Sequence, residues 1–155
     1  ERYDLELIEQ PVAGHDHIGL RAVSDALDTP VMADEALQSV ADAFELARLG
    51  ACDVFNLKIV KPGGLYRAMQ VAAVARSAGI GLMIGSMPEL GVATAAAAHF
   101  AAATPGRLYP CELIGPLMVE RDVVRDPDLA AMIATGRLPV PHGPGLGVDL
   151  LDGVA

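Results

Sequence analysis

The run Val54-Phe55-Asn56-Leu57-Lys58-Ile59, with the turn Lys61-Pro62-Gly63-Gly64 close behind it, decides the fold of this chain. A short and almost continuous apolar run is typical of a parallel strand that is covered on both faces. Proline and glycine end the run, and residues 65–78 then carry apolar side chains at helical spacing. The stretch is therefore one strand–helix unit, and Asn56 and Lys58 are polar side chains within its buried strand.

Outward from this unit, the same alternation covers most of the chain. Strands are predicted near residues 5–9, 31–34, 54–59, 81–85 and 108–113, and helices near 18–27, 40–49, 65–78 and 92–103. Strands that alternate with helices pair in parallel, with each helix as a crossover. This α/β order fits either an open doubly wound sheet or an arc of a (β/α)8 barrel. No GxGxxG follows a strand, which weighs against the dinucleotide-binding form of the open sheet.

The alternation stops at about Leu117. A short helix is predicted over residues 128–133, and the glycine and proline residues between 139 and 147 then make an irregular, turn-rich segment. We therefore expect two parts. Residues 1–116 form the β/α part, and residues 117–155 form a tail that packs over another part of the protein.

The composition excludes several classes of function. The net charge of −9 and the 4% of aromatic residues give neither the basic surface nor the stacking platforms of a nucleic-acid binder. The most apolar helix candidate, residues 92–103, is shorter than the ~20 residues that cross a bilayer. Cys52 and Cys111 form no CxxC pair and no zinc spacing, so we expect two reduced thiols. The chain is expected in the cytoplasm, with no nucleic-acid or membrane partner.

Glu9, Asp34 and Lys58 end three successive predicted strands, and 25 and then 24 residues separate them. In parallel α/β architectures such ends meet on one rim, where active sites lie. Two carboxylates on one rim repel each other unless a cation joins them, and their oxygens suit Mg²⁺ or Mn²⁺. A desolvated lysine can act as a base. Each residue alone could equally cap a helix or face solvent, but the even spacing favours a site.

Several motifs resemble the enolase superfamily in its muconate-cycloisomerase-like branch, to which mandelate racemase is related. The motifs, in chain order, are Glu9-Gln10-Pro11, Ala33-Asp34-Glu35, residues 57–64, Gly85-Ser86-Met87-Pro88-Glu89, residues 112–117 and residues 144–148. The resemblance covers nearly the whole chain. It implies strands four to eight of a (β/α)8 barrel, followed by a tail that packs on the barrel or on the family's capping domain.

The resemblance also implies roles for the polar residues. Glu9 and Asp34 match two of the three carboxylates that bind one Mg²⁺ or Mn²⁺ ion, and Lys58 matches a lysine that acts as an acid/base or electrostatic group. Two residues, Glu35 and Asn56, would orient Asp34 and Lys58, and two others, Glu89 and Glu112, would line the cavity for a small carboxylate substrate. The metal would stabilise the enediolate that forms when an α-proton leaves.

The family's capping domain, its first three strands, one metal carboxylate and one lysine have no counterpart in these 155 residues. We therefore expect the C-terminal part of a cycloisomerase, inactive as an isolated fragment and oligomeric in the full-length protein. The Glu112-Leu113-Ile114-Gly115-Pro116 segment favours cycloisomerase chemistry over dipeptide epimerisation. Amino-acid racemase and acid-sugar dehydratase remain alternatives in the same superfamily. A non-catalytic half-barrel module is an alternative of another class, and a phosphate-binding barrel ranks low because residues 61–64 lack P-loop spacing.

Overall fold

The computed structural model describes residues 2–125, 132 and 135–154. The short helix predicted over residues 128–133 falls, apart from Met132, outside this described part. The chain divides into two compact units, one formed by residues 1–83 with 106–110 and the other by residues 84–105 with 111–155. The predicted division at residue 116 is a different one, and it stays a prediction.

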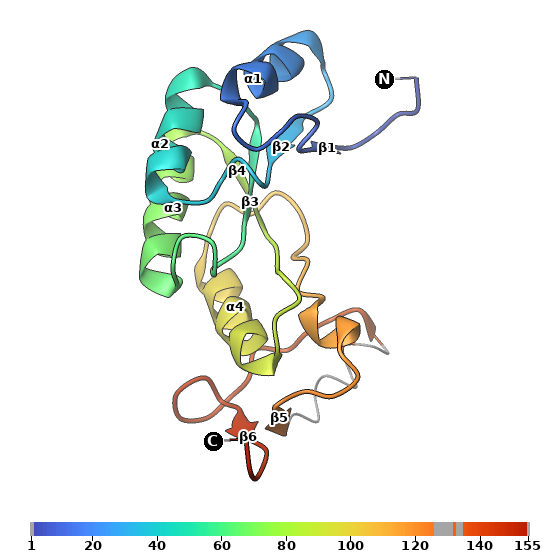
Figure 1. Cartoon of the computed structure of the whole chain (residues 1–155), viewed down its shortest axis with the longest axis vertical. Helices are drawn as coiled ribbons and strands as arrows, with labels where there is room; N and C mark the ends of the chain where they lie inside the picture. Colours follow the sequence, from blue (N-terminus) through green and yellow to red (C-terminus); the bar gives the residue numbers. More distant parts are fainter. Residues whose placement is uncertain (1, 126–131, 133–134, 155) are drawn as a thin grey trace. The chain divides into compact units, whose positions relative to one another are not determined.

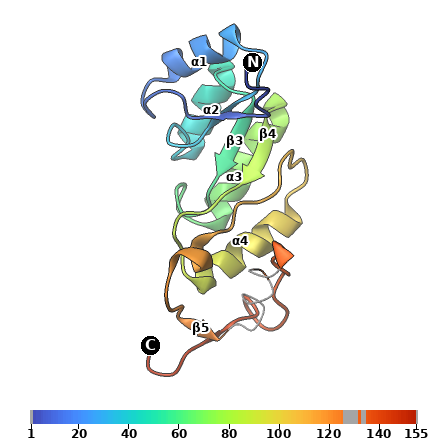
Figure 2. The ribbon, with the colours of Figure 1, turned by 90° about the vertical axis from the view of Figure 1, so that its right-hand side faces the viewer.

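The main sheet has four strands in the sequential order β1 (Ile8–Glu9), β2 (Val31–Ala33), β3 (Val54–Leu57) and β4 (Gly81–Ile84). Ile8 pairs with Val31 and Met32 pairs with Val54, both in parallel register. Figure 1 shows these strands in blue to green, and Figure 2 shows β3 and β4 side by side. Sequential parallel pairing confirms the α/β class, because it is what repeated strand–helix–strand units produce.

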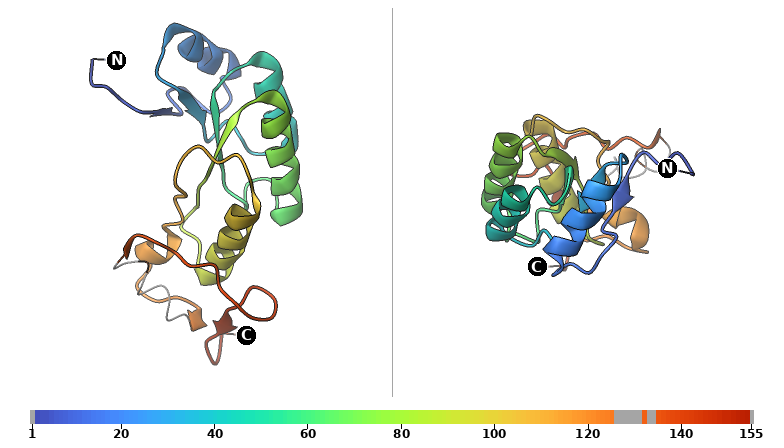
Figure 3. Two further views of the ribbon diagram at one scale, coloured as in Figure 1. Left: turned by 180° about the vertical axis from the view of Figure 1, so that it is seen from behind. Right: turned by 90° about the horizontal axis from the view of Figure 1, so that it is seen from above.

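Three helices connect these strands: α1 (His17–Ala26), α2 (Val40–Leu49) and α3 (Leu65–Ala78). The observed bounds of α2 and α3 equal the predicted ranges, and α1 is shifted by one residue at each end. Helices α2 and α3 contact each other along their length and lie on the same side of the strands (Figure 3).

Local signals explain where these helices begin and end. The Asp16 carboxylate accepts a hydrogen bond from the Gly19 N–H at 2.7 Å, and the Ser39 hydroxyl accepts one from the Asp42 N–H at 3.2 Å. These are N-caps of the usual kind. Helices α2 and α3 end at Gly50 and Gly79, which take left-handed backbone angles that glycine adopts without steric cost.

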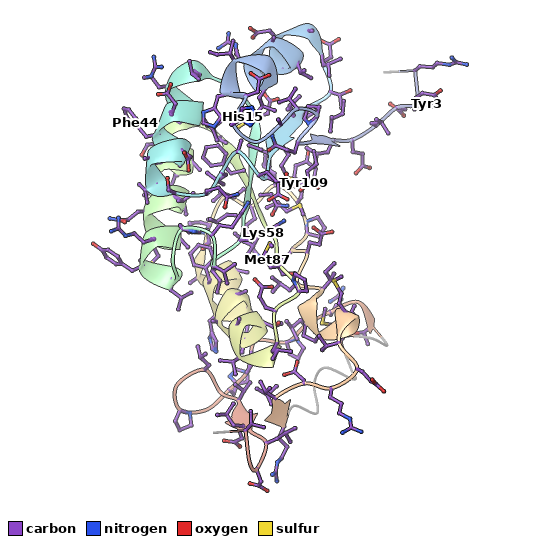
Figure 4. All side chains as sticks on the ribbon, viewed as in Figure 1. Tyr3, His15, Phe44, Lys58, Met87 and Tyr109 are labelled. Atoms are coloured by element: carbon purple, nitrogen blue, oxygen red, sulfur yellow. The ribbon has the colours of Figure 1, made fainter. Side chains whose placement is uncertain are left out.

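The core lies between this sheet and one stripe of each helix. Every residue of β2 and β3 is buried, which explains why both read as apolar runs. On α2 the buried side chains are Ala43 and Leu46. Phe44 is 63% exposed and points outward from α2 (Figure 4).

The second unit is built around α4 (Gly91–Ala103), an alanine-rich helix that is buried along most of its length. It also contains the 3-10 turn η1 (Gly115–Met118) and the antiparallel pair β5 (Val124–Arg125) and β6 (Asp149–Leu150). The Asp122 carboxylate accepts from the Gly91 N–H at 2.8 Å. This hydrogen bond joins the start of α4 to the segment before β5, and the packing predicted for residues 117–155 stays a prediction. No helix in the described part of the chain is long and apolar enough to cross a membrane.

The strand predicted over residues 108–113 is wrong as a continuous element. The structure has two isolated parallel bridges instead, Leu82 with Arg107 and Gly85 with Glu112. The partners are 25 residues apart in the first bridge (107 − 82) and 27 in the second (112 − 85), so the register slips between them. Pro110 lies in this stretch and has no N–H to donate to a ladder.

Candidate functional site

The three residues at the strand ends lie on one edge of the sheet. Glu9 is the last residue of β1, and Asp34 and Lys58 directly follow β2 and β3. The Lys58 Nζ donates to Asp34 Oδ2 at 2.6 Å. Their side chains are 13% and 11% exposed, so this ion pair is largely shielded from water. Figure 4 labels Lys58 where it leaves β3. The structure thus brings two of the three predicted residues into direct contact.

A second lysine, Lys61, binds the same carboxylate. Its Nζ donates to Asp34 Oδ1 at 2.6 Å and to the Asp34 main-chain oxygen at 2.6 Å, and its side chain is 8% exposed. The chain contains two lysines, and both bind Asp34. Lys61 was not among the residues predicted for the site. Its position three residues after Lys58, in a glycine-rich turn, is the signal that could have found it.

Asn56 is fully buried in β3 and holds Glu9. Its Nδ2 donates to Glu9 Oε1 at 2.8 Å, a contact across 47 residues of sequence. Asn56 was expected to orient Asp34 or Lys58, and the structure places it against Glu9 instead. The other amide atom, Oδ1, is buried without a hydrogen-bond partner among the described residues. A buried polar atom without a partner is costly in a core and is commoner at functional sites.

Gln10, which was not predicted as a site residue, holds the backbone around Asp34. Its Oε1 accepts from the Asp34 N–H at 2.8 Å and from the Ala36 N–H at 3.1 Å. Gln10 has a φ of 40°, a left-handed angle that is uncommon outside glycine. A backbone strained in this way persists only where neighbouring contacts fix it. No sequence pattern marks this angle.

The protonation of the site follows from its contacts. Burial raises the pKa of Glu9, and the nearby Asp34 charge raises it further, against the lowering effect of the Asn56 hydrogen bond. Burial also acts to raise the pKa of Asp34, but the hydrogen bonds from Lys58 and Lys61 outweigh it and hold that pKa below its usual value. The pKa of Lys61 is lowered, chiefly by burial. Asp34 is therefore the stronger acid of the two carboxyl groups, and Glu9 is the weaker one.

Three other predicted residues take no part in the hydrogen bonds described above. Glu35 is exposed and borders a hollow of 710 Å³ together with His15, His17 and Asp42. In the second unit, both carboxylate oxygens of Glu89 are buried and have no hydrogen-bond partner among the described residues. Glu112 is exposed and belongs to the same unit. That Glu89 and Glu112 line a substrate cavity stays a prediction.

The donor set fits a hard divalent cation in part. Glu9 and Asp34 supply carboxylate oxygens, the ligands that Mg²⁺ prefers. Burial raises the pKa of Glu9, and the nearby Asp34 charge adds to that rise. The described residues contain no group of three or more His, Cys, Asp or Glu side chains that could hold a metal. Further ligands would have to come from water, from a substrate or from another part of the protein.

Comparison with known proteins places the chain in a family. The sequence model of enolase C-terminal domain-like proteins matches residues 1–154. The chain belongs to this family. The resemblance drawn from the strand-end motifs is thereby confirmed.

The relatives are isomerases. The chain is 42% identical over 146 residues to muconate cycloisomerase 1 of Rhodococcus opacus, covering 94% of this chain and 38% of that protein. It is 38% identical over 144 residues to the L-Ala-D/L-Glu epimerase of Bacillus subtilis (strain 168), covering 93% of this chain and 38% of that protein. A muconate lactonizing enzyme from Pseudomonas fluorescens, solved as a complex with muconolactone, superposes with a TM-score of 0.85 at 38% identity. That match covers 94% of this chain and 38% of the solved chain. The chain thus spans less than half the length of these relatives.

Proposed function

We propose that this chain is the C-terminal catalytic part of a divalent-metal-dependent cycloisomerase that converts a muconate-type dicarboxylate to a lactone. The observation that carries this proposal is the Lys58–Asp34 ion pair beside Glu9, on one edge of a parallel sheet. The motifs around these residues occur in a chain that is similar to muconate cycloisomerases over most of its length.

The fold is proposed to be strands four to eight of a (β/α)8 barrel. Two features support this. The main sheet has the sequential order of a barrel rather than the reversed order of a doubly wound sheet. The likeness to muconate lactonizing enzyme extends over 94% of the chain. The remaining strands, a third metal carboxylate and a second lysine would then be supplied by the rest of a longer protein.

Glu9 and Asp34 are the residues that would hold the metal, Mg²⁺ or Mn²⁺. When bound, the metal supplies electrostatic stabilisation of the negative charge that develops on the substrate carboxylate. Asn56 holds Glu9 in place, and Gln10 and Lys61 hold Asp34. Lys58 is the group that gives or takes a proton at the substrate carbon, or stabilises charge there.

A racemase or epimerase is the second candidate. The 38% identity to an L-Ala-D/L-Glu epimerase favours it, because that protein is matched over nearly as much of this chain as the cycloisomerases are. A lysine next to a carboxylate site can transfer a proton or stabilise charge, and either role suits both reactions. The substrate class, rather than the residues named here, separates the two functions.

Lactone formation from cis,cis-muconate is the decisive assay, run with full-length protein, Mg²⁺ or Mn²⁺, and L-Ala-L-Glu as the competing substrate. Lys58→Met should remove turnover of whichever substrate reacts, and Arg76→Met, an exposed change on α3, should not. Epimerisation of the dipeptide without lactone formation would replace the first candidate by the second. Turnover of neither substrate, with no binding of either metal, would favour a non-catalytic module.

We further propose that the substrate is a small carboxylate, that the full-length protein is a homo-oligomer, and that the protein works in the cytoplasm. The open edges of an incomplete sheet would favour association of the isolated 155-residue chain. The isolated 155-residue chain is proposed to lack turnover, since part of the ligand set lies elsewhere.

A further inference from the structure

We infer that Lys61 fixes Asp34 so that a divalent cation and Lys58 must compete for one oxygen, Oδ2, and that cation binding thereby frees the Lys58 ammonium. This inference rests on the metal site proposed above. It adds a role for Lys61 as a positioning residue and a link between metal binding and the availability of Lys58.

The contacts of the two lysines with Asp34 are unequal. Lys61 Nζ contacts two atoms, Oδ1 and the main-chain oxygen, both at 2.6 Å. Lys58 Nζ contacts Oδ2 at 2.6 Å. An ammonium held by two acceptors, one of them on the backbone, is harder to displace than one held by a single carboxylate oxygen. Oδ2 is therefore the oxygen of Asp34 that an incoming cation can take.

The turn after β3 fixes Lys61 in this position. The Lys61 N–H donates to the Lys58 main-chain oxygen at 3.1 Å, and the Gly64 N–H donates to the Ile59 oxygen at 2.9 Å. Gly63 and Gly64 have φ of 97° and 107°, angles that an L side chain rarely adopts. The turn reverses the direction of the chain after Lys58, and the side chain of Lys61 therefore reaches the Asp34 carboxylate, as that of Lys58 does.

The backbone of Asp34 is held from the other side as well. Gln10 Oε1 accepts from the Asp34 N–H at 2.8 Å, while Lys61 donates to the Asp34 main-chain oxygen. Both backbone polar groups of Asp34 are engaged and Oδ1 is occupied by Lys61, so Oδ2 is the oxygen at which a cation would meet Lys58. A divalent cation and an ammonium on the same oxygen repel each other, and we infer that they compete there.

The exchange has a chemical consequence for Lys58. While its ammonium is hydrogen-bonded to Asp34, Lys58 is committed to that carboxylate and is not free to meet a substrate. A divalent cation brings twice the charge of an ammonium to Oδ2 and repels the ammonium that it replaces. Lys58 then leaves Oδ2 and becomes available at the edge where the substrate would bind. Binding of the metal to Asp34 and release of the Lys58 ammonium from Asp34 would thus occur together.

Amine acetylation followed by mass spectrometry tests this directly, because Lys58 and Lys61 can be quantified as separate sites. The full-length protein is labelled without added metal and then with saturating Mg²⁺ or Mn²⁺, and metal binding is followed in parallel by calorimetry. We expect both lysines to be protected without metal. With metal, Lys58 should label several-fold faster, and Lys61 should stay protected.

Two variants sharpen the test. In Lys61→Met, Oδ1 is free, so Asp34 can serve Lys58 and a cation together, and the metal-dependent rise in Lys58 labelling should be lost. Lys61→Arg keeps a cationic donor and should preserve the rise. Circular dichroism shows whether each variant folds, and Lys61→Arg together with the unmodified protein keeps the inference testable if Lys61→Met does not fold.

The outcomes separate the two proposals. Metal binding without release of Lys58, or with equal release of both lysines, overturns the inference and leaves the metal site standing. Absence of metal binding overturns the metal site and the inference with it. A rise in Lys58 labelling that persists in Lys61→Met shows that Lys61 does not position Asp34 in the way inferred.

Discussion

Gln10 reaches from the end of β1 to the end of β2, where its Oε1 accepts hydrogen bonds from the Asp34 N–H at 2.8 Å and the Ala36 N–H at 3.1 Å. It does so from a left-handed backbone, with φ of 40°. The side chain thus links the two strand ends that carry Glu9 and Asp34. The two hydrogen bonds of the Gln10 side chain offset the cost of the left-handed backbone angle of this residue.

Gln10→Ala should lower the free energy of unfolding by about 1–3 kcal/mol, because it leaves two backbone N–H groups without their acceptor. Gln10→Gly removes the same acceptor but relieves the left-handed angle, so it should cost less than Gln10→Ala. Urea unfolding of the two variants measures the difference. Equal losses would mean that the backbone angle stores no strain.

Lys61→Met should lower the free energy of unfolding of the metal-free protein by about 1.5–3 kcal/mol, since Asp34 loses a charged hydrogen-bond donor but keeps Lys58. The Asp34 carboxylate would lose hydrogen bonds to both its Oδ1 and its main-chain oxygen. The double variant Lys61→Met with Asp34→Asn should be more stable than the sum of the single losses predicts. A double-mutant cycle from urea unfolding gives this coupling, and strict additivity would contradict the contact.

The contributions of Asp34 and Glu9 to folding stability should change with pH in opposite directions. The pKa of Asp34 is held below its ordinary value of 3.8, because its lysine hydrogen bonds outweigh burial. Below that value the unfolded chain takes up protons before the folded chain does, so the stability from Asp34 is complete above 3.8 and is lost as pH falls through the lower, folded pKa. Burial raises the pKa of Glu9 above 4.5, so its folded form binds protons more readily, and its contribution falls as pH rises above 4.5.

Glu9→Gln isolates the second of these effects. The variant lacks the carboxylate whose ionisation costs stability, so its stability relative to the unmodified protein should improve between pH 4.5 and about pH 7. Urea unfolding of both proteins at the two pH values measures it. A difference that stays constant, or that moves the other way, would show that the Glu9 pKa is not raised in the folded chain. Mg²⁺ must be absent from these measurements.

The parts of this structure that local signals encode could be predicted. Helices α2 and α3 have the predicted bounds, because Ser39 and two glycines define their ends within a few residues of sequence. Glu9, Asp34 and Lys58 could be grouped, because one strand–helix unit separates each from the next. Such regular spacing is visible without any knowledge of tertiary contacts.

The parts that depend on contacts distant in sequence could not be predicted. Pairing beside β4 is interrupted near Pro110 by a shift in register, which the apolar pattern of residues 108–113 does not show. The role of Gln10 depends on a backbone angle, and the role of Lys61 depends on a turn that returns its side chain to Asp34. Asn56 was recognised as polar within a strand, but its partner Glu9 lies 47 residues away.

Gly115 tests packing in the second unit, independently of the metal site. A Cβ at this position would lie 2.2 Å from the main-chain oxygen of Glu89, an approach that no side-chain atom tolerates. Gly115→Ala should therefore lower the free energy of unfolding by about 1–3 kcal/mol, the usual cost of overpacking. It should also displace the backbone that carries Glu89.

Gly106→Ala is the matched control, because a Cβ there meets nothing within 4 Å and the variant bears only the cost of a left-handed angle, φ of 80°. That cost is about 1–2 kcal/mol. Hydrogen exchange separates the two variants even where their stabilities coincide. Gly115→Ala should speed exchange of the amides around Glu89 and η1, whereas Gly106→Ala should affect only its own loop. Unchanged exchange around Glu89 in Gly115→Ala would show that the backbones of Glu89 and Gly115 are not in contact.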